Sequence, residues 1–156
     1  MGKLNEIVLK FKYLWVFYIL QSSLAAAVLY PLFFVFGEER LVLISAMGAT
    51  AFIVFAMPTT GSAKAHVVIG SHIVGLISGA LFSSAIFPNT IGCPLAVGLA
   101  IFLMVALDIE HPPAAGTAMA IVINRPSTDI FVTVIACAII LASSRYLLRH
   151  HLRNLV

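Results

Sequence analysis

Residues 108–117 read DIEHPPAAGT, which places two carboxylates, one histidine and two adjacent prolines inside a chain that is otherwise strongly apolar. A helix cannot run unbroken through Pro112 and Pro113, because neither residue has an amide proton and each ring crowds the preceding turn. Irregular backbone cannot face lipid, since its amide and carbonyl groups would have no hydrogen-bond partners there. We therefore expect the rest of the fold to enclose this break.

The composition indicates an all-α polytopic membrane protein. Of the 156 residues, 62% are hydrophobic and 10% are charged, and the mean hydropathy is +1.10. This length allows one domain, residues 1–156, with about four to six membrane-crossing helices of ~20 residues each. The formal charge of +3 comes from Lys and Arg clusters near both ends. Because no basic face of a folded domain is recognisable, we expect the bilayer as a partner and no nucleic acid.

Polar and proline-containing turns divide the chain into apolar segments, each of which is expected to form a helix. The segments cover about residues 13–36, 41–57, 65–87, 95–107, 114–123 and 129–148. The first is too long for the core of a signal peptide and is expected to be a retained span. The fifth measures only about 15 Å as a helix, half of a bilayer, and is expected to be a half-helix. Six crossings remain possible, and so do four crossings with re-entrant pieces.

Two stretches of the sequence resemble each other. Residues 48–54 read GATAFIV before Pro58, and residues 116–122 read GTAMAIV before Pro126, with a long apolar segment after each proline. This similarity indicates a possible inverted repeat of three plus three segments. Basic residues near both termini predict that both ends are cytoplasmic, which requires an even number of crossings.

Small residues recur every four positions in the third segment, at Ser71, Gly75, Gly79 and Ser83. This spacing predicts a close helix–helix seam. About 150 residues barely surround a path through the membrane, so we expect a homo-oligomer, with Gly75 and Gly79 offering a seam between subunits.

The two prolines suit the start of a helix, where a missing amide proton costs no hydrogen bond. With Pro112 in the first helical position, the free amides of residues 114–116 are expected to point back toward His111. A helix N-terminus attracts anions, and Thr117 adds a hydroxyl one position further on. We therefore predict an anion site at Pro112–Gly116. The alternative is a Pro-Pro turn at the bilayer surface with its acids in water.

The ionisable residues of the apolar stretches are candidates for function, because charges inside a membrane are costly. Either Asp108 and Glu110 lie solvated at the mouth of the site, or one of them is protonated and takes part in proton coupling. His111 can change its charge near neutral pH. His72, in the middle of the third segment, either bonds a neighbouring helix or lines a polar path.

Other polar or reactive side chains give weaker signals. Small residues around Thr50 indicate close contact with a helix or a cavity. Lys64 and His66 are expected to be interfacial charges, and Cys93 and Cys137 are expected to be free thiols because they show no disulfide or zinc spacing. No convincing metal site, catalytic nucleophile or nucleotide-binding fingerprint is recognised.

Three runs together resemble the HPP family of integral membrane proteins, which is named for the tripeptide found at residues 111–113. They are GATAFIVFAMP at 48–58, VIGSH at 68–72 and EHPPAAGTA at 110–118. The matching motif positions are His111, Pro112, Pro113, Gly116, Thr117, Gly70, Ser71 and His72. Family members are usually described with four transmembrane helices, and plastid and cyanobacterial relatives are described as nitrite transporters. No plastid transit peptide is recognisable, so we expect a bacterial inner membrane.

The resulting hypothesis is a transporter or channel for a small anion, nitrite first, that is not an enzyme and needs no cofactor or metal. The expected substrate-binding residues are Thr50, His72, His111, Pro112, Pro113, Ala114, Ala115, Gly116 and Thr117, with Asp108 and Glu110 as candidates for proton coupling. One alternative is a membrane-embedded enzyme that uses Asp108, Glu110, His111 and His72 as acid–base or metal groups. Another is a structural or assembly subunit.

Overall fold

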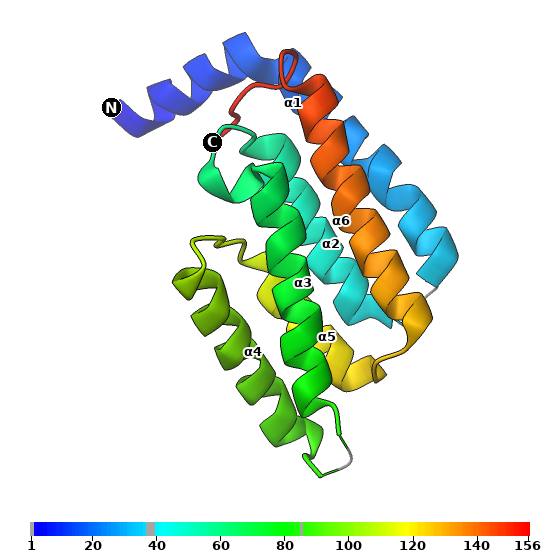
Figure 1. The fold of residues 1–156 in the computed structure, drawn as a ribbon. Coiled ribbons are helices and arrows are strands. Elements are labelled where there is room, and N and C mark those ends of the chain that lie inside the picture. Colours follow the sequence, from blue (N-terminus) through cyan, green and yellow to red (C-terminus); the bar gives the residue numbers. More distant parts are fainter. Residues whose placement is uncertain (1, 37–39, 85) are drawn as a thin grey trace.

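The apolar segments fold into six α-helices that alternate in direction along the bundle (Figure 1). This computed structural model describes residues 2–36, 40–84 and 86–156. The helices are α1 (Gly2–Phe36), α2 (Leu41–Ala56), α3 (Ala65–Phe82), α4 (Asn89–Ala106), α5 (Pro113–Asn124) and α6 (Thr128–Leu148), and a 3-10 turn, η2 (Gly61–Ala63), precedes α3. No strand occurs in these described ranges, and the all-α fold class is confirmed.

Four of these helices are long and apolar enough to cross a membrane, namely α1, α3, α4 and α6. Helix α2 has 16 residues and α5 has 12, so both are shorter than the ~20 residues of a full crossing. The expected short helix after the prolines is therefore confirmed. The helix lengths favour four spans with two shorter helices packed among them.

Most helix boundaries lie close to the predicted ones, with three exceptions. Helix α1 begins at Gly2 and not near residue 13, because Lys and Glu support a helix although they lower the hydropathy. Helix α3 ends at Phe82 and not near residue 87. Helix α4 begins at Asn89, six residues before the apolar run, since the amides of Ile91 and Gly92 both donate to the Pro88 carbonyl at 2.9 Å. Of the polar turn expected between the first two segments, residues 37–39 lie outside the described residues.

The helices contact one another in a pattern that supports the inverted repeat. Helix α3 packs against α4, α5 and α6, while α2 packs against α1, α5 and α6. Exchanging α1 with α4, α2 with α5 and α3 with α6 converts these contacts into one another. The α1–α2 contact becomes the α4–α5 contact, α2–α6 becomes α3–α5, and α1–α6 becomes α3–α4. The two halves also run in opposite directions (Figure 1), as an inverted repeat requires.

The predicted small-residue seam lies between α3 and α5. A Cβ atom added at Gly75 would lie 2.5 Å from the Ala114 carbonyl oxygen, and one at Gly79 would lie 2.6 Å from the Ala118 carbonyl oxygen. Glycine at these positions lets the two backbones approach closely. Because α5 fills this face of α3, Gly75 and Gly79 do not form a seam between subunits, and that part of the oligomer hypothesis is wrong.

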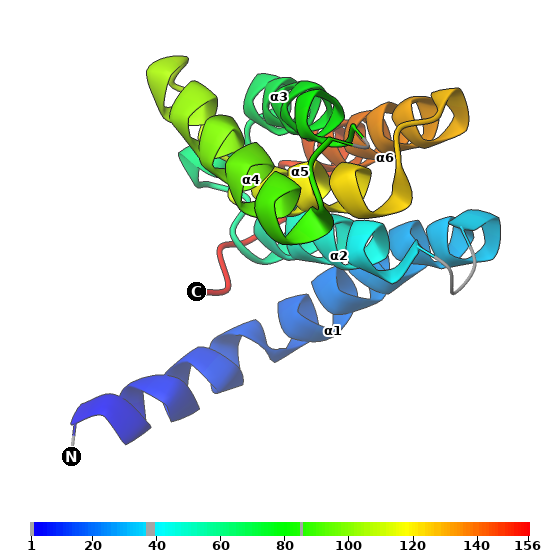
Figure 2. The same ribbon diagram turned by 90° about the horizontal axis from the view of Figure 1, so that it is seen from below.

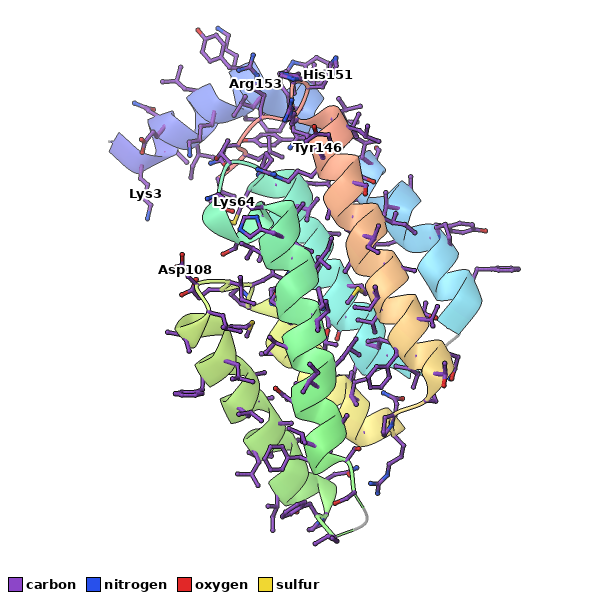
Figure 3. The ribbon with its side chains drawn as sticks, in the orientation of Figure 1. Lys3, Lys64, Asp108, Tyr146, His151 and Arg153 are labelled. Atoms are coloured by element: carbon purple, nitrogen blue, oxygen red, sulfur yellow. The ribbon has the colours of Figure 1, made fainter. Side chains whose placement is uncertain are left out.

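Both chain ends lie at the same end of the bundle (Figures 1 and 3). The buried side chain of Gln21 in α1 accepts a hydrogen bond from the Arg153 amide at 2.9 Å and donates to the Arg153 carbonyl at 3.0 Å. It also donates to the Phe55 carbonyl in α2. The last residues thus tie α1 to α2. At the opposite end, Arg40 and Asp129 form an ion pair with a separation of 2.8 Å between the starts of α2 and α6.

The outer faces of the helices carry exposed apolar side chains, among them Phe34, Phe102 and Leu147. Figure 2 shows α1 along one side of the bundle, with its first turns leaving the other helices. A surface of this kind is expected where the surrounding solvent is lipid.

Candidate functional site

The backbone break between α4 and α5 turns into the bundle at His111. Asp108 starts the turn with a left-handed φ of 56°, and the Ile109 amide donates to the Met104 carbonyl at 3.0 Å. Asp108, Glu110 and Pro112 are exposed, whereas the side chain of His111 has no exposed surface. The expected enclosure of the break by protein is therefore confirmed for His111. The side chains of Asp108 and Glu110 are not enclosed.

The first turn of α5 differs from the prediction. Pro113, and not Pro112, takes the first helical position. The Ala114 amide donates to the His111 carbonyl at 2.9 Å, and the Ala115 amide donates to the Pro112 carbonyl at 3.1 Å. The expectation that these two amides are free is wrong, because the tight Pro-Pro turn brings carbonyl groups within reach of both. The helix dipole remains, and its positive end faces His111.

Two histidines and two threonines form one continuous hydrogen-bonded row, here called the His–Thr row. His111 Nδ1 lies 2.8 Å from the Ser62 carbonyl oxygen, and His111 Nε2 lies 3.1 Å from Thr50 Oγ1. Thr50 Oγ1 lies 3.0 Å from His72 Nε2, and His72 Nδ1 lies 2.9 Å from Thr117 Oγ1. The two imidazole rings meet edge to face, with their centroids 5.4 Å apart.

Each member of the His–Thr row comes from a different element. Thr50 belongs to α2, His72 to α3 and Thr117 to α5, while His111 precedes α5. All four side chains are fully buried. Buried polar groups in an apolar core are costly unless they are hydrogen-bonded, and here every ring nitrogen and both hydroxyls have partners. The row therefore fixes the relative positions of three helices.

A polar cavity of about 230 Å³, here called the mouth, opens beside the row. It is lined by Gly61, Ser62, Lys64, His66, Val67, Asp108 and Glu110. Lys64, His66 and both acids are exposed, as expected of residues at a membrane interface. Figure 3 shows Lys64 in the half of the bundle that holds the two termini, and Asp108 at the end of α4 nearer to them. Ser62 joins this mouth to the interior, because its carbonyl oxygen is a partner of His111.

Two more cavities border the helix break. One, of about 290 Å³, is lined by residues of α4 and by Glu110, His111, Pro112 and Ala115. Glu110 therefore borders both this cavity and the mouth. The other is an open apolar groove of about 680 Å³ between α2 and α5, to which Pro112, Pro113 and Gly116 contribute.

The structure thus brings together four of the predicted site residues, Thr50, His72, His111 and Thr117. Pro112, Pro113 and Gly116 border the groove, and the buried Ala114 lies under Gly75. The carbonyl of Ser62 could not be recognised in the sequence, since a backbone acceptor leaves no side-chain signal. In the part of the chain that the structure describes, no three His, Cys, Asp or Glu side chains gather as metal ligands.

Comparisons with known proteins agree with this picture of a helical membrane protein. A transmembrane protein of Dictyostelium discoideum is 31% identical over 109 residues, which cover 64% of this chain and 38% of that relative. The chain thus spans well under half of the relative's length. No solved structure matches the chain. The sequence model described as the HPP transmembrane region matches residues 9–153. The chain is a multi-pass membrane protein in contact with the lipid bilayer, and it belongs to the HPP family.

Proposed function

We propose that this protein carries a small anion, nitrite first, across the membrane and that the anion passes beside the His–Thr row. The observation that carries the proposal is the burial of two imidazoles and two hydroxyls beside a broken helix among apolar spans. Ionisable groups at such depth are functional candidates by default. Broken helices near the middle of the membrane are a common site of substrate binding in transporters.

The chemistry of the row favours a small anion. A protonated imidazole attracts an anion through its charge, and the positive end of the α5 dipole faces His111 as well. The carboxylates of Asp108 and Glu110, which repel anions, are exposed at the mouth. The choice of nitrite comes from the resemblance to transporters of the family.

The distribution of positive charge suggests the orientation. Lys3, Lys64 and Arg153 lie in the half of the bundle that holds the termini (Figure 3), and Arg145 donates to the Pro58 carbonyl that follows α2. Excess Lys and Arg mark the cytoplasmic side of membrane proteins. We propose that both termini and the polar mouth face the cytoplasm, in a bacterial inner membrane.

An enzymatic role is less well supported. Asp108 and Glu110 line the mouth, whereas both ring nitrogens of His72 are bonded to threonines. The four residues that an acid–base or metal enzyme would use are therefore not gathered around one cavity. We propose that the protein is not an enzyme.

We retain a homo-oligomer in the proposal. The reason is that two of the six helices are too short to cross alone, so a single chain offers few helices to surround a path. The mass of the protein in lipid nanodiscs measures this directly.

Nitrite uptake into proteoliposomes tests the function. We expect His111→Ala and Thr117→Val to lower the uptake rate about tenfold or more, since a lost charge-assisted hydrogen bond is worth about 1.5–3 kcal/mol. His150→Ala, at an exposed position after α6, and Gly98→Ala, where an added Cβ meets open space, are matched controls. Circular dichroism and gel filtration verify folding. Wild-type rates in both test variants, or no uptake above protein-free vesicles, would remove the proposal.

A further inference from the structure

We infer that the anion moves together with a proton, that His111 carries this proton, and that the Thr50 hydroxyl is the switch that admits it. This inference deepens the proposed function and depends on it, because the same residues are involved. It rests on the positions that hydrogen atoms can occupy between the donor and acceptor atoms of the His–Thr row.

Only one arrangement of hydrogens in the uncharged His–Thr row satisfies all four of its contacts. The Ser62 carbonyl can only accept, so Nδ1 of His111 carries the ring proton and Nε2 is an acceptor. The Thr50 hydroxyl must then donate to His111 Nε2. Since a hydroxyl has a single proton, His72 Nε2 donates to the Thr50 oxygen. His72 Nδ1 in turn accepts from Thr117. Every donor points from Thr117 toward Ser62.

Thr50 has a second acceptor within reach. Its Oγ1 lies 3.0 Å from the Ala46 carbonyl oxygen, one helical turn earlier in α2. When a proton is added to His111 Nε2, both nitrogens of that ring become donors. The Thr50 hydrogen then turns to Ala46, and the Thr50 oxygen accepts from His111 and His72 together. Neutral and protonated His111 are thus both fully hydrogen-bonded, without movement of any heavy atom.

His72 lacks this freedom. A proton added to its Nδ1 would displace the Thr117 hydrogen, and that hydroxyl has no other partner among the described residues. Two imidazolium rings with centroids 5.4 Å apart would also repel each other. The row therefore accepts one extra proton, at His111.

The groups around His111 are compatible with one positive charge. Its own segment contributes the exposed acids Asp108 and Glu110, and Lys64 and His66 lie across the mouth. From α3 it faces His72. Helices α2 and α5 contain no ionisable side chain, and α4 contains only Cys93. Glu110, which borders both the mouth and the cavity at His111, is the carboxylate placed to offset the charge.

The added proton leaves from the nitrogen that receives it. The Nδ1 hydrogen of His111 stays on the ring, because its partner, the Ser62 carbonyl, accepts a hydrogen bond but takes up no proton. The proton on Nε2 is therefore the one that is gained and released, and the Thr50 hydrogen turns between Ala46 and His111 as this happens. Farther along α3, Ser78 is a buried hydroxyl with no partner among the described residues, and it extends the polar groups toward the opposite end.

The coupling is tested in proteoliposomes that contain a pH-sensitive dye, at equal neutral pH on both sides and with the membrane potential clamped. A nitrite pulse is expected to acidify the lumen by about one proton per anion carried, since His111 accepts a single proton. Protein-free vesicles give the baseline, because nitrous acid crosses bilayers unaided. Thr50→Val, which keeps the shape but removes the hydroxyl, is expected to lower this acidification about tenfold or more, and Thr50→Ser is expected to restore it.

The outcomes separate the two proposals. Nitrite uptake without acidification, or normal coupling in Thr50→Val, would overturn the inference and leave anion transport standing. No uptake by the wild type would overturn both.

A second measurement leaves the His–Thr row unchanged, so its result does not depend on whether the Thr50 variants fold. Replacing the exposed His66, His150 and His151 by Gln leaves two histidines for nitrogen-15 NMR in lipid, and Thr117→Val identifies the signals of His72. We expect neutral His111 to carry its proton on Nδ1 and His72 on Nε2. The opposite tautomer at His111 would overturn the inferred switch.

Discussion

At the scale of single residues, the members of the His–Thr row depend on one another. Thr50 links the two rings, and Thr117 is the partner of the outer nitrogen of His72. A change at one position therefore leaves a buried polar atom unsatisfied at the next.

Thr117→Val tests this dependence through stability. The valine keeps the shape of the side chain but leaves His72 Nδ1 without a donor, which is expected to lower the free energy of unfolding by about 1–3 kcal/mol. Thr133→Val is the matched control, because the Thr133 hydroxyl bonds only the carbonyl of Asp129 in its own helix. Unfolding in increasing SDS measures both. Equal midpoints for the two variants would contradict the role assigned to Thr117.

The sequence allowed the residues of the site to be predicted, but not how they are arranged in space. His72, His111 and Thr117 stand out because polar side chains are rare in apolar segments. Their bridging through Thr50 could not be predicted, since α2 and α3 meet only in the folded chain. The backbone acceptors at Ser62 and Ala46 leave no trace in the sequence. The free amides at Ala114 and Ala115 were predicted wrongly, because a proline turn can close on its own carbonyls.

At the scale of the elements, the contact between α3 and α5 holds His72 against Thr117. Glycines at 75 and 79 allow this contact, and no side chain of α5 could shift far enough to admit a Cβ, since backbone carbonyls lie in the way. The spacing of small residues predicted such a seam correctly. Its partner could not be predicted, because the pattern is the same for a helix of this chain and for a second subunit.

Gly79→Ala is expected to destabilise the fold by about 1–3 kcal/mol, the usual cost of overpacking a well-packed site. The added Cβ would lie 2.6 Å from both the Ala118 carbonyl oxygen and the Ile121 Cβ. Gly98→Ala in α4, where nothing lies within 4 Å of the added Cβ, is expected to be neutral or slightly stabilising. Thermal unfolding in detergent compares the two. A Gly79→Ala protein as stable as Gly98→Ala would show that the helices are not in close contact.

Helix ends were the least predictable part of the elements. Hydropathy marks where side chains prefer lipid, and the charged first turns of α1 carry helix well beyond that limit. Helix α4 also begins before the apolar run. Pro94, its sixth residue, removes one amide donor, and the helix continues through it from Asn89.

At the scale of the whole molecule, the mouth of the row opens toward the half of the bundle that holds Lys3, Lys64 and Arg153 (Figure 3). The proposed orientation therefore also fixes the side from which the row is reached. The even number of helices returns the chain to the end where it began (Figure 1).

Cysteine accessibility tests the orientation. In a protein with Cys93 and Cys137 replaced by alanine, Lys64→Cys at the mouth is expected to react with an impermeant maleimide only from the cytoplasmic side. Thr128→Cys, exposed at the opposite end of the bundle, is expected to react only from the other side. The expectation follows from the excess of Lys and Arg at the first end. The reverse pattern of labelling would place the mouth outside the cytoplasm.

The clasp between Gln21 and Arg153 has a consequence for how the first helix stays in place. The side-chain amide of Gln21 bonds both the amide and the carbonyl of Arg153, 132 positions away, as a residue of a neighbouring β-strand would. Proline at position 153 would take away the amide hydrogen of that pair, whereas alanine would keep it. The position of α1 thus depends on the C-terminal segment of the chain. It depends on the backbone of Arg153 and not on the charge of the Arg153 side chain.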